Sequence, residues 1–123
     1  MKRPRLVSIF LVALPVVVLA QTATIERHVT AKPDTNIIAG IFAEFDEGCD
    51  AAPLPTARLL TPPAHGNVTM TQSNLQRCPN KNEPAWVAIY RSNKDFTGED
   101  SFAVEMKSAD GKLRIQKITV TVK

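Results

Sequence analysis

The sequence contains few of the residues that catalytic and metal sites require. Its 123 residues include two histidines, His28 and His65, and two cysteines, Cys49 and Cys78. A zinc-type site needs at least about three clustered His, Cys or carboxylate ligands, and a Ser-His-Asp triad needs a histidine beside a serine and a carboxylate. Neither histidine belongs to such a pattern. The sequence therefore predicts a protein that is not an enzyme and that has no cofactor.

Helical patterning is also missing after residue 20. Apolar residues there alternate over short runs, and turn-forming residues separate these runs. No repeat of solenoid length occurs. Together these absences exclude helical bundles and repeat arrays, and they favour an all-β domain.

The one long apolar run lies at the N-terminus, in residues 6–20 (LVSIFLVALPVVVLA), after a start that contains three basic residues. Val18 and Ala20 occupy the positions where signal peptidase prefers small residues, so the pattern is typical of a secretory signal peptide. The alternative is a membrane anchor. Fifteen helical residues reach about 22 Å, less than a hydrocarbon core of about 30 Å, and Pro15 is unfavourable within such a span. We therefore expect export and cleavage, with no stable membrane insertion afterwards.

Cleavage changes the charge of the protein. Residues 1–20 are the expected signal peptide, and residues 21–123 the expected single domain. The chain has 15 basic and 12 acidic residues, and three of the basic ones lie in the first five positions. The remaining 12 basic residues equal the 12 acidic ones. A neutral domain gives no reason to expect a nucleic acid as partner.

The cysteine pair suggests a disulfide. In an exported chain, an even number of cysteines most simply forms disulfides, so we expect Cys49 to pair with Cys78. Closing a loop of about 30 residues would contribute roughly 3–4 kcal/mol on the chain-entropy estimate. The alternatives are a metal pair or a reactive thiol, but neither cysteine has a neighbouring Cys or His at ligand spacing.

Two alternating runs, residues 86–90 and 101–106, organise the chain. They flank a polar corner at residues 95–100 (DFTGED). In the second run Phe102 and its alternate neighbours share one face, so both runs predict strands with one buried face.

Five further strands are expected, in residues 24–30, 35–45, 56–60, 67–71 and 113–122. The first would be an edge strand. In the second, Gly40 suggests a bulge or a close backbone approach, and the two apolar faces predict that part of the strand is covered on both sides. A phase change in the last strand predicts a bulge near residues 116–117.

The connections between these strands carry turn signals. Residues 31–34 and the proline-rich residues 61–66 predict corners, and Asp110-Gly111 predicts a tight hairpin. Residues 46–55 and 72–84 are expected to be long loops. Seven short strands with such turns predict an antiparallel immunoglobulin-like β-sandwich.

Residues 62–122 resemble bacterial immunoglobulin-like and cadherin-like repeat domains of exported proteins. The matching residues follow the order of that family's pattern: Pro63, His65-Gly66, Val68, Tyr90, Phe96, Gly98, Asp100, Phe102 and Val120-Thr121-Val122. The chain departs from the family at Ser92, where a proline is usual, and in the segment around Cys78. The resemblance implies a sandwich fold, and such domains mostly act as stalks, adhesion modules or binding surfaces.

Two sets of residues are candidates for binding. Asp95, Glu99 and Asp100 form a weak candidate calcium site, although Asp100 is better explained as a cap for the backbone donors of its corner. Asp46, Glu47, Asp50, Asn80 and Lys81 lie in the two expected long loops, which the disulfide would join.

Trp86 and Tyr90 share one strand face with Ala88 between them. They predict either an exposed aromatic platform or, more simply, part of the core.

The sequence thus favours a non-enzymatic domain, periplasmic or extracellular, that binds a protein or surface polymer or has a structural role. The alternative is a small secreted enzyme, enzyme inhibitor or enzyme accessory protein. An inhibitor would use residues 78–81 (CPNK) as its insert.

Overall fold

The computed structural model describes residues 2–5, 7–16, 22–44, 53–78 and 81–123, without the side chains of residues 77, 78 and 81. Its strands are β1 (Ala23–Ala31), β2 (Ile37–Phe42), β3 (Thr56–Thr61), β4 (Gly66–Cys78), β5 (Lys81–Ser92), β6 (Gly98–Lys107) and β7 (Leu113–Val122).

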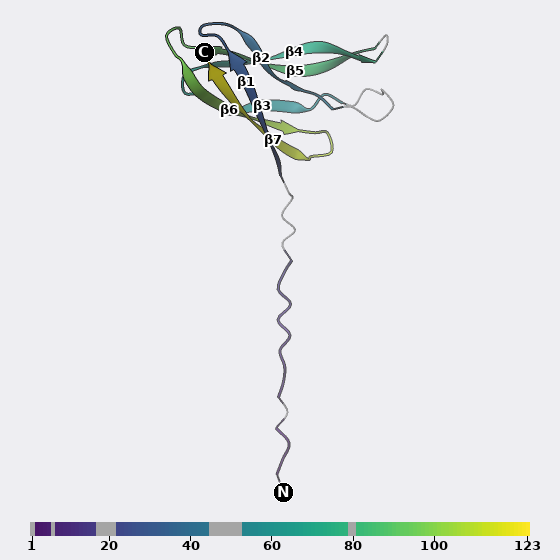
Figure 1. Cartoon of the computed structure of the whole chain (residues 1–123). Helices are drawn as coiled ribbons and strands as arrows, with labels where there is room; N and C mark the ends of the chain where they lie inside the picture. The colour runs from purple at the N-terminus through teal and green to yellow at the C-terminus, as the bar shows by residue number, and fades with distance from the viewer. Residues whose placement is uncertain (1, 6, 17–21, 45–52, 79–80) are drawn as a thin grey trace.

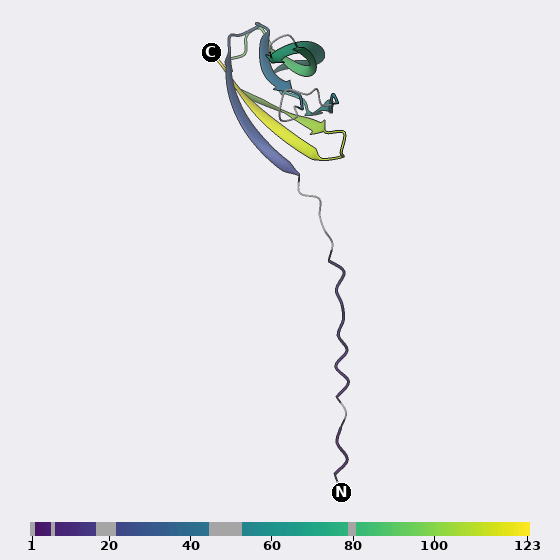
Figure 2. The ribbon, with the colours of Figure 1, turned by 90° about the vertical axis from the view of Figure 1, so that its right-hand side faces the viewer.

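The seven strands form two sheets that pack face to face (Figures 1 and 2). One sheet has the order β1-β7-β6-β3, and the other has the order β2-β5-β4. This is the strand order of an immunoglobulin-like sandwich in which the first strand lies beside the last. The predicted all-β sandwich of seven strands is therefore confirmed.

The N-terminal residues lie outside this sandwich. Residues 2–5 and 7–16 form neither helix nor strand, and the tail extends away from the domain (Figure 1). Its apolar side chains are exposed, as expected of a signal peptide that is not part of the fold; Leu11, for example, is 90% exposed. The cleavage position lies within residues 17–21, outside the described residues, so it stays a prediction. No described helix has the length and apolarity needed to cross a membrane.

The core lies between the two sheets, as the alternating runs predict. Phe102, Val104 and Met106 of β6 are buried, and so are Ile118, Val120 and Val122 of β7. Ala88 and Tyr90 of β5 close the core from the other sheet. The reading of Tyr90 as a core residue is thus confirmed. Trp86 is partly buried against the core, and its indole N–H donates to the carbonyl of Pro55 at 2.8 Å.

One pairing differs from the antiparallel expectation. β1 is an edge strand, as predicted, but it runs parallel to β7, with a continuous register from Ala23↔Arg114 to Ala31↔Val122. β1 and β7 are far apart in sequence, so no turn fixes their relative direction. The chain instead enters β2 through a tight turn at Pro33-Asp34, which crosses to the other sheet.

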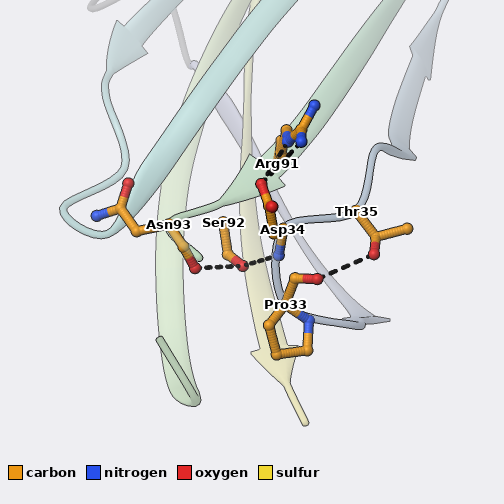
Figure 3. Close-up of polar contacts among 6 residues, drawn as sticks. All are labelled: Pro33, Asp34, Thr35, Arg91, Ser92 and Asn93. Carbon is orange, nitrogen blue, oxygen red and sulfur yellow. Dashed lines mark hydrogen bonds and ion pairs between the residues drawn. The ribbon is translucent and has the colours of Figure 1, made fainter. Parts of the chain in front are cut away.

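Figure 3 shows how this turn is held. Asp34 has a positive φ of 52°, and its backbone N–H donates to Ser92 Oγ at 3.1 Å. Its carboxylate accepts a hydrogen bond from Arg91 Nε at 2.8 Å. The turn is therefore attached to the C-terminal end of β5, which joins the β1–β2 connection to the second sheet.

A bulge decides which side chains of β2 face the core. The bulge predicted at Gly40 is present as a register shift between Ile38 and Gly40. Because of it, Ala39 and Phe42 both face the core, while Ile38 and Ile41 are 63% and 43% exposed. The part of this strand that is covered on both sides therefore does not include these isoleucines.

The bulge predicted near residues 116–117 is absent from β7. Its pairing with β6 runs without a shift from Gly98↔Val122 to Lys107↔Leu113. The regular phase places Gln116 on the core side and Ile115 on the outer side. The sequence suggested a phase change because Gln116, which lies on the core side at the end of the core, is polar. The hairpin predicted at Asp110-Gly111 is confirmed, with Gly111 at φ 88°.

The largest error concerns residues 72–84, which we expected to be a loop. β4 and β5 instead pair continuously from Gly66↔Ser92 to Gln76↔Asn82, with Cys78↔Lys81 beyond a shift. Asn, Gln and Pro are disfavoured in strands, so composition predicted a loop. Pro84 is tolerated because β2 ends opposite Trp86, so that among the described strands none pairs with β5 on that side at Pro84.

Candidate functional site

The residues of the resemblance pattern meet at one corner of the sandwich, around the Asp100 carboxylate. Asp100 lies near the start of β6, where it pairs with Val120 of β7, and it is 4% exposed. Its Oδ1 accepts from the backbone N–H of Ala64 at 3.0 Å, and its Oδ2 accepts from the backbone N–H of His65 at 3.1 Å. Tyr90 Oη donates to Oδ2 at 2.8 Å from the other sheet. One carboxylate thus joins the 61–66 corner, β5 and β6.

Two pairs of rings pack around this carboxylate. The His65 and Phe96 rings stack with centroids 4.2 Å apart and 7° between their planes. The Tyr90 and Phe102 rings are nearly parallel, with centroids 6.1 Å apart. These four aromatic residues and Asp100 all belong to the pattern on which the resemblance rests, and in this chain they form a structural corner.

Gly66 belongs to the same corner. A Cβ at this position would lie 2.5 Å from the backbone oxygen of Arg91 and 3.0 Å from Ser92 Cα. Since backbone atoms cannot move aside cheaply, no side chain fits there. This close approach explains why glycine follows His65.

The corner also changes the acidity of Tyr90. Its burial, followed by the hydrogen bond and the negative charge of Asp100, raises the pKa of the Tyr90 phenol far above its usual value. The tyrosine therefore stays a neutral donor across the physiological pH range. It acts as a permanent link between the two sheets.

An open groove of about 510 Å³ lies beside this corner. It is lined by Thr61, Pro62, Ala64, His65, Glu99, Asp100, Ser101, Lys117 and Thr119. Although serine, histidine and aspartate are all present, Asp100 bonds the backbone of His65, and the imidazole stacks on Phe96. The geometry is therefore that of a packed corner, without the carboxylate–imidazole bond of a catalytic triad.

The structure does not bring the three candidate calcium residues together as a cluster of ligands. Asp95 and Glu99 are exposed, whereas Asp100 is buried and bonded as above. Across the described residues, no group of three His, Cys, Asp or Glu side chains lies close enough to hold a metal ion. His28 is exposed on β1.

The β4–β5 pair forms the second candidate site. We call residues 73–78 and 81–85 the ribbon, because here the two strands pair beyond the end of β2 (Figure 1). One face of the ribbon is exposed and carries Asn74, Gln76, Asn82 and Pro84. On the other face Glu83 and Ala85 are buried. We call the exposed set the amide face; an amide offers both donors and acceptors without charge.

Most of the predicted binding-loop residues lie outside the described part of the chain. Asp46, Glu47, Asp50 and Cys49 lie in residues 45–52, and Asn80 lies in residues 79–80, all outside the described residues. Lys81 begins β5 and Cys78 ends β4, with their side chains not described. The pairing of Cys49 with Cys78 therefore stays a prediction. The amide face was missed because its strands were expected to be a loop.

Comparisons with known proteins identify no family for this chain. No protein-family model matches the chain, and no curated protein matches it significantly. A solved structure similar to it is a 2,6-sialyltransferase of Vibrionaceae Photobacterium sp. JT-ISH-224, in a ternary complex with the donor product CMP and the acceptor substrate lactose. The identity is 11% and the TM-score 0.43, and the match covers 85% of this chain and 18% of the enzyme. This chain spans less than a fifth of that protein, and a likeness of this size carries no conclusion about function.

Proposed function

We propose that the chain is an exported, non-enzymatic immunoglobulin-like domain of the bacterial repeat-domain type, which binds a protein or surface polymer through the amide face of its ribbon. The observation that carries this proposal is the extension of β4 and β5 past the end of β2. Two-stranded ribbons are marginally stable in water by themselves. One face of the ribbon, with Glu83 and Ala85, is already buried within the chain. A partner would therefore add its contacts on the exposed amide face.

The chemistry of the amide face indicates the class of partner. Asn74, Gln76 and Asn82 are exposed and uncharged, so they suit peptide groups or sugar hydroxyls better than phosphates or carboxylates. Because the described members of this face carry no charge, binding should depend weakly on salt. The domain would act in the periplasm or outside the cell.

A triple variant, Asn74→Ala with Gln76→Ala and Asn82→Ala, tests this surface. The exported protein and the variant would be compared on glycan and peptide arrays and in pull-downs from periplasmic and cell-surface extracts. We expect at least about a tenfold loss of retention, since each lost hydrogen bond contributes about 0.5–1.5 kcal/mol.

The matched control is Asn36→Ala with Asn93→Ala, two exposed asparagines outside the ribbon. Equal retention of the triple variant and the native protein would contradict the placement of the site. Loss of retention in the control alone would contradict it as well.

An inhibitor is the second candidate, because β4 ends at Cys78 and β5 begins at Lys81. An insert at this end of the ribbon would enter the cleft of an enzyme. Inhibition of a secreted hydrolase that Lys81→Ala abolishes, with the fold intact, would favour this function over the first.

A further inference from the structure

The two open sheets leave four edge strands among the described residues: β1 and β3 in one sheet, and β2 and β4 in the other. An edge strand presents unpaired backbone N–H and C=O groups, which attract further strands. Soluble proteins usually protect such edges with charge, bulges or short strands. The four edges of this sandwich differ in this respect.

Three of the edges carry such protection. β1 has the charged residues Glu26 and Arg27, both exposed. β2 has six residues and a register shift between Ile38 and Gly40. β3 also has six residues, includes Arg58, and shifts between Leu59 and Thr61.

β4 has none of these features over most of its length. It has 13 residues, and residues 66–76 (GNVTMTQSNLQ) contain neither a charge nor a proline. Its pairing with β5 has no shift before Gln76. Among the described strands, β4 is therefore the long edge that lacks protection.

The backbone phase of this edge can be determined. Asn93 donates to the carbonyl of His65, just beyond the Gly66↔Ser92 pair. Hydrogen-bonded pairs of an antiparallel ladder alternate, so odd-numbered residues of β4 bond to β5, and even-numbered residues direct their N–H and C=O outward. Pro84 is consistent with this phase. It lies opposite the even-numbered Asn74, in a pair without hydrogen bonds between β4 and β5, so its missing N–H removes no bond of that ladder.

We infer that the β4 edges of two copies of this chain pair antiparallel about a two-fold axis at Thr71, forming one six-stranded sheet. Thr71 is the midpoint of the uncharged stretch of residues 66–76. A two-fold axis perpendicular to the sheet places opposite residues of the two copies on the same face. In this register even-numbered residues meet even-numbered ones, so the outward N–H and C=O groups of the two copies can form about twelve hydrogen bonds across the new ladder.

The side chains of β4 also suit a second copy. On the outer face Thr71 meets its own counterpart and Thr69 meets Ser73, and such hydroxyl pairs are favourable across strands. No residue within 66–76 meets a like charge. The β4 edge carries no charge that would favour an oppositely charged strand of another protein. The β4 strand of a second copy, by contrast, has the same length and the same polarity. The inference does not depend on the proposed function. Pairing at the edge uses backbone groups in the plane of the sheet, whereas the side chains of the amide face point out of that plane.

The oligomeric state of the exported protein, measured by sedimentation from micromolar to millimolar concentration, tests this inference. We expect a concentration-dependent mass of two chains. Thr71→Lys and Thr71→Glu each place like charges opposite one another, so each should weaken the dimer on the order of 100-fold. Mixing the two variants should restore a dimer that contains one copy of each.

Thr24→Lys on the exposed part of β1 is the matched control and should dimerise like the native protein. A native protein that stays monomeric throughout would overturn the inference, as would a Thr71→Lys variant that dimerises normally. If the charged variants do not fold, Thr71→Cys replaces them. Its two thiols should form a reducible link between copies, and failure to link at high concentration would equally overturn the inference.

Discussion

Tyr90 and Asp100 connect the two sheets of the sandwich through a hydrogen bond of 2.8 Å between the phenol and the carboxylate. Both residues are buried, and Asp100 also accepts the backbone N–H groups of Ala64 and His65. The same carboxylate therefore fixes the pairing of the sheets and the path of the corner.

Removing this link should destabilise the domain. We expect Tyr90→Phe to lower the free energy of unfolding by about 1.5–3 kcal/mol, because a hydrogen bond to a charged group is lost. Asp100→Ala should lower it further, since four donors then lose their acceptor: the Tyr90 hydroxyl and the backbone N–H groups of Ala64, His65 and Ser101. Urea unfolding followed by fluorescence measures both. Ser101→Ala changes an exposed neighbour and should be near neutral; an equal loss there would contradict this assignment.

Alkaline pH should weaken the same link. The pKa of Tyr90 is raised in the folded state, so folding favours the protonated phenol. Its contribution to stability is complete below the unfolded pKa of about 10 and decreases as the pH rises toward the folded pKa. Above about pH 10 the stability difference between the native protein and Tyr90→Phe should shrink by up to about 1.4 kcal/mol per pH unit. A difference that stays constant to about pH 11 would contradict the raised pKa.

Gly66 should tolerate no side chain. A Cβ there would clash with the backbone of Arg91, so Gly66→Ala should cost about 1–3 kcal/mol or prevent folding. Gly111 is a suitable control, because its φ is 88° and no atom lies within 4 Å of its would-be Cβ. Gly111→Asn should cost less, since asparagine tolerates this backbone conformation. Thermal melts of the two variants in parallel would show the difference.

The predicted cystine can be tested by mass. If Cys49 and Cys78 are linked in the exported protein, its intact mass should rise by that of two thiol hydrogens on reduction. Cys49→Ser and Cys78→Ser should each lower the free energy of unfolding by about 3–4 kcal/mol. Free thiols in the native exported protein would show that the prediction was wrong.

The alternation of apolar residues predicted the core strands well, because burial of one sheet face leaves a clear period of two. Phe102, Val104 and Met106 lie on one buried face, as expected. The Asp110-Gly111 turn was equally clear. In both cases the local sequence and the final environment agree, so neighbouring residues were sufficient.

The ribbon and the parallel β1–β7 pair were not predictable in this way. Asn74, Gln76 and Pro84 have low strand propensity, and their strand conformation follows from backbone pairing across the hairpin. The direction of β1 relative to β7 depends on contacts between residues about 90 positions apart in sequence, such as Thr24↔Ile115. The roles of Asp100 and Gly66 likewise became clear only when the corner was assembled.

The parallel course of β1 and β7 has a mechanical consequence. The chain enters β1 at one pole of the domain, and β7 ends at the opposite pole, where Lys123 donates its backbone N–H to Ala31 (Figure 1). A pull applied between Ala23 and Val122 would load the ladder in shear, so that its hydrogen bonds resist together and do not open one after another. An exported domain held between two anchoring points would therefore resist stretching better than a hairpin whose ends leave from the same side.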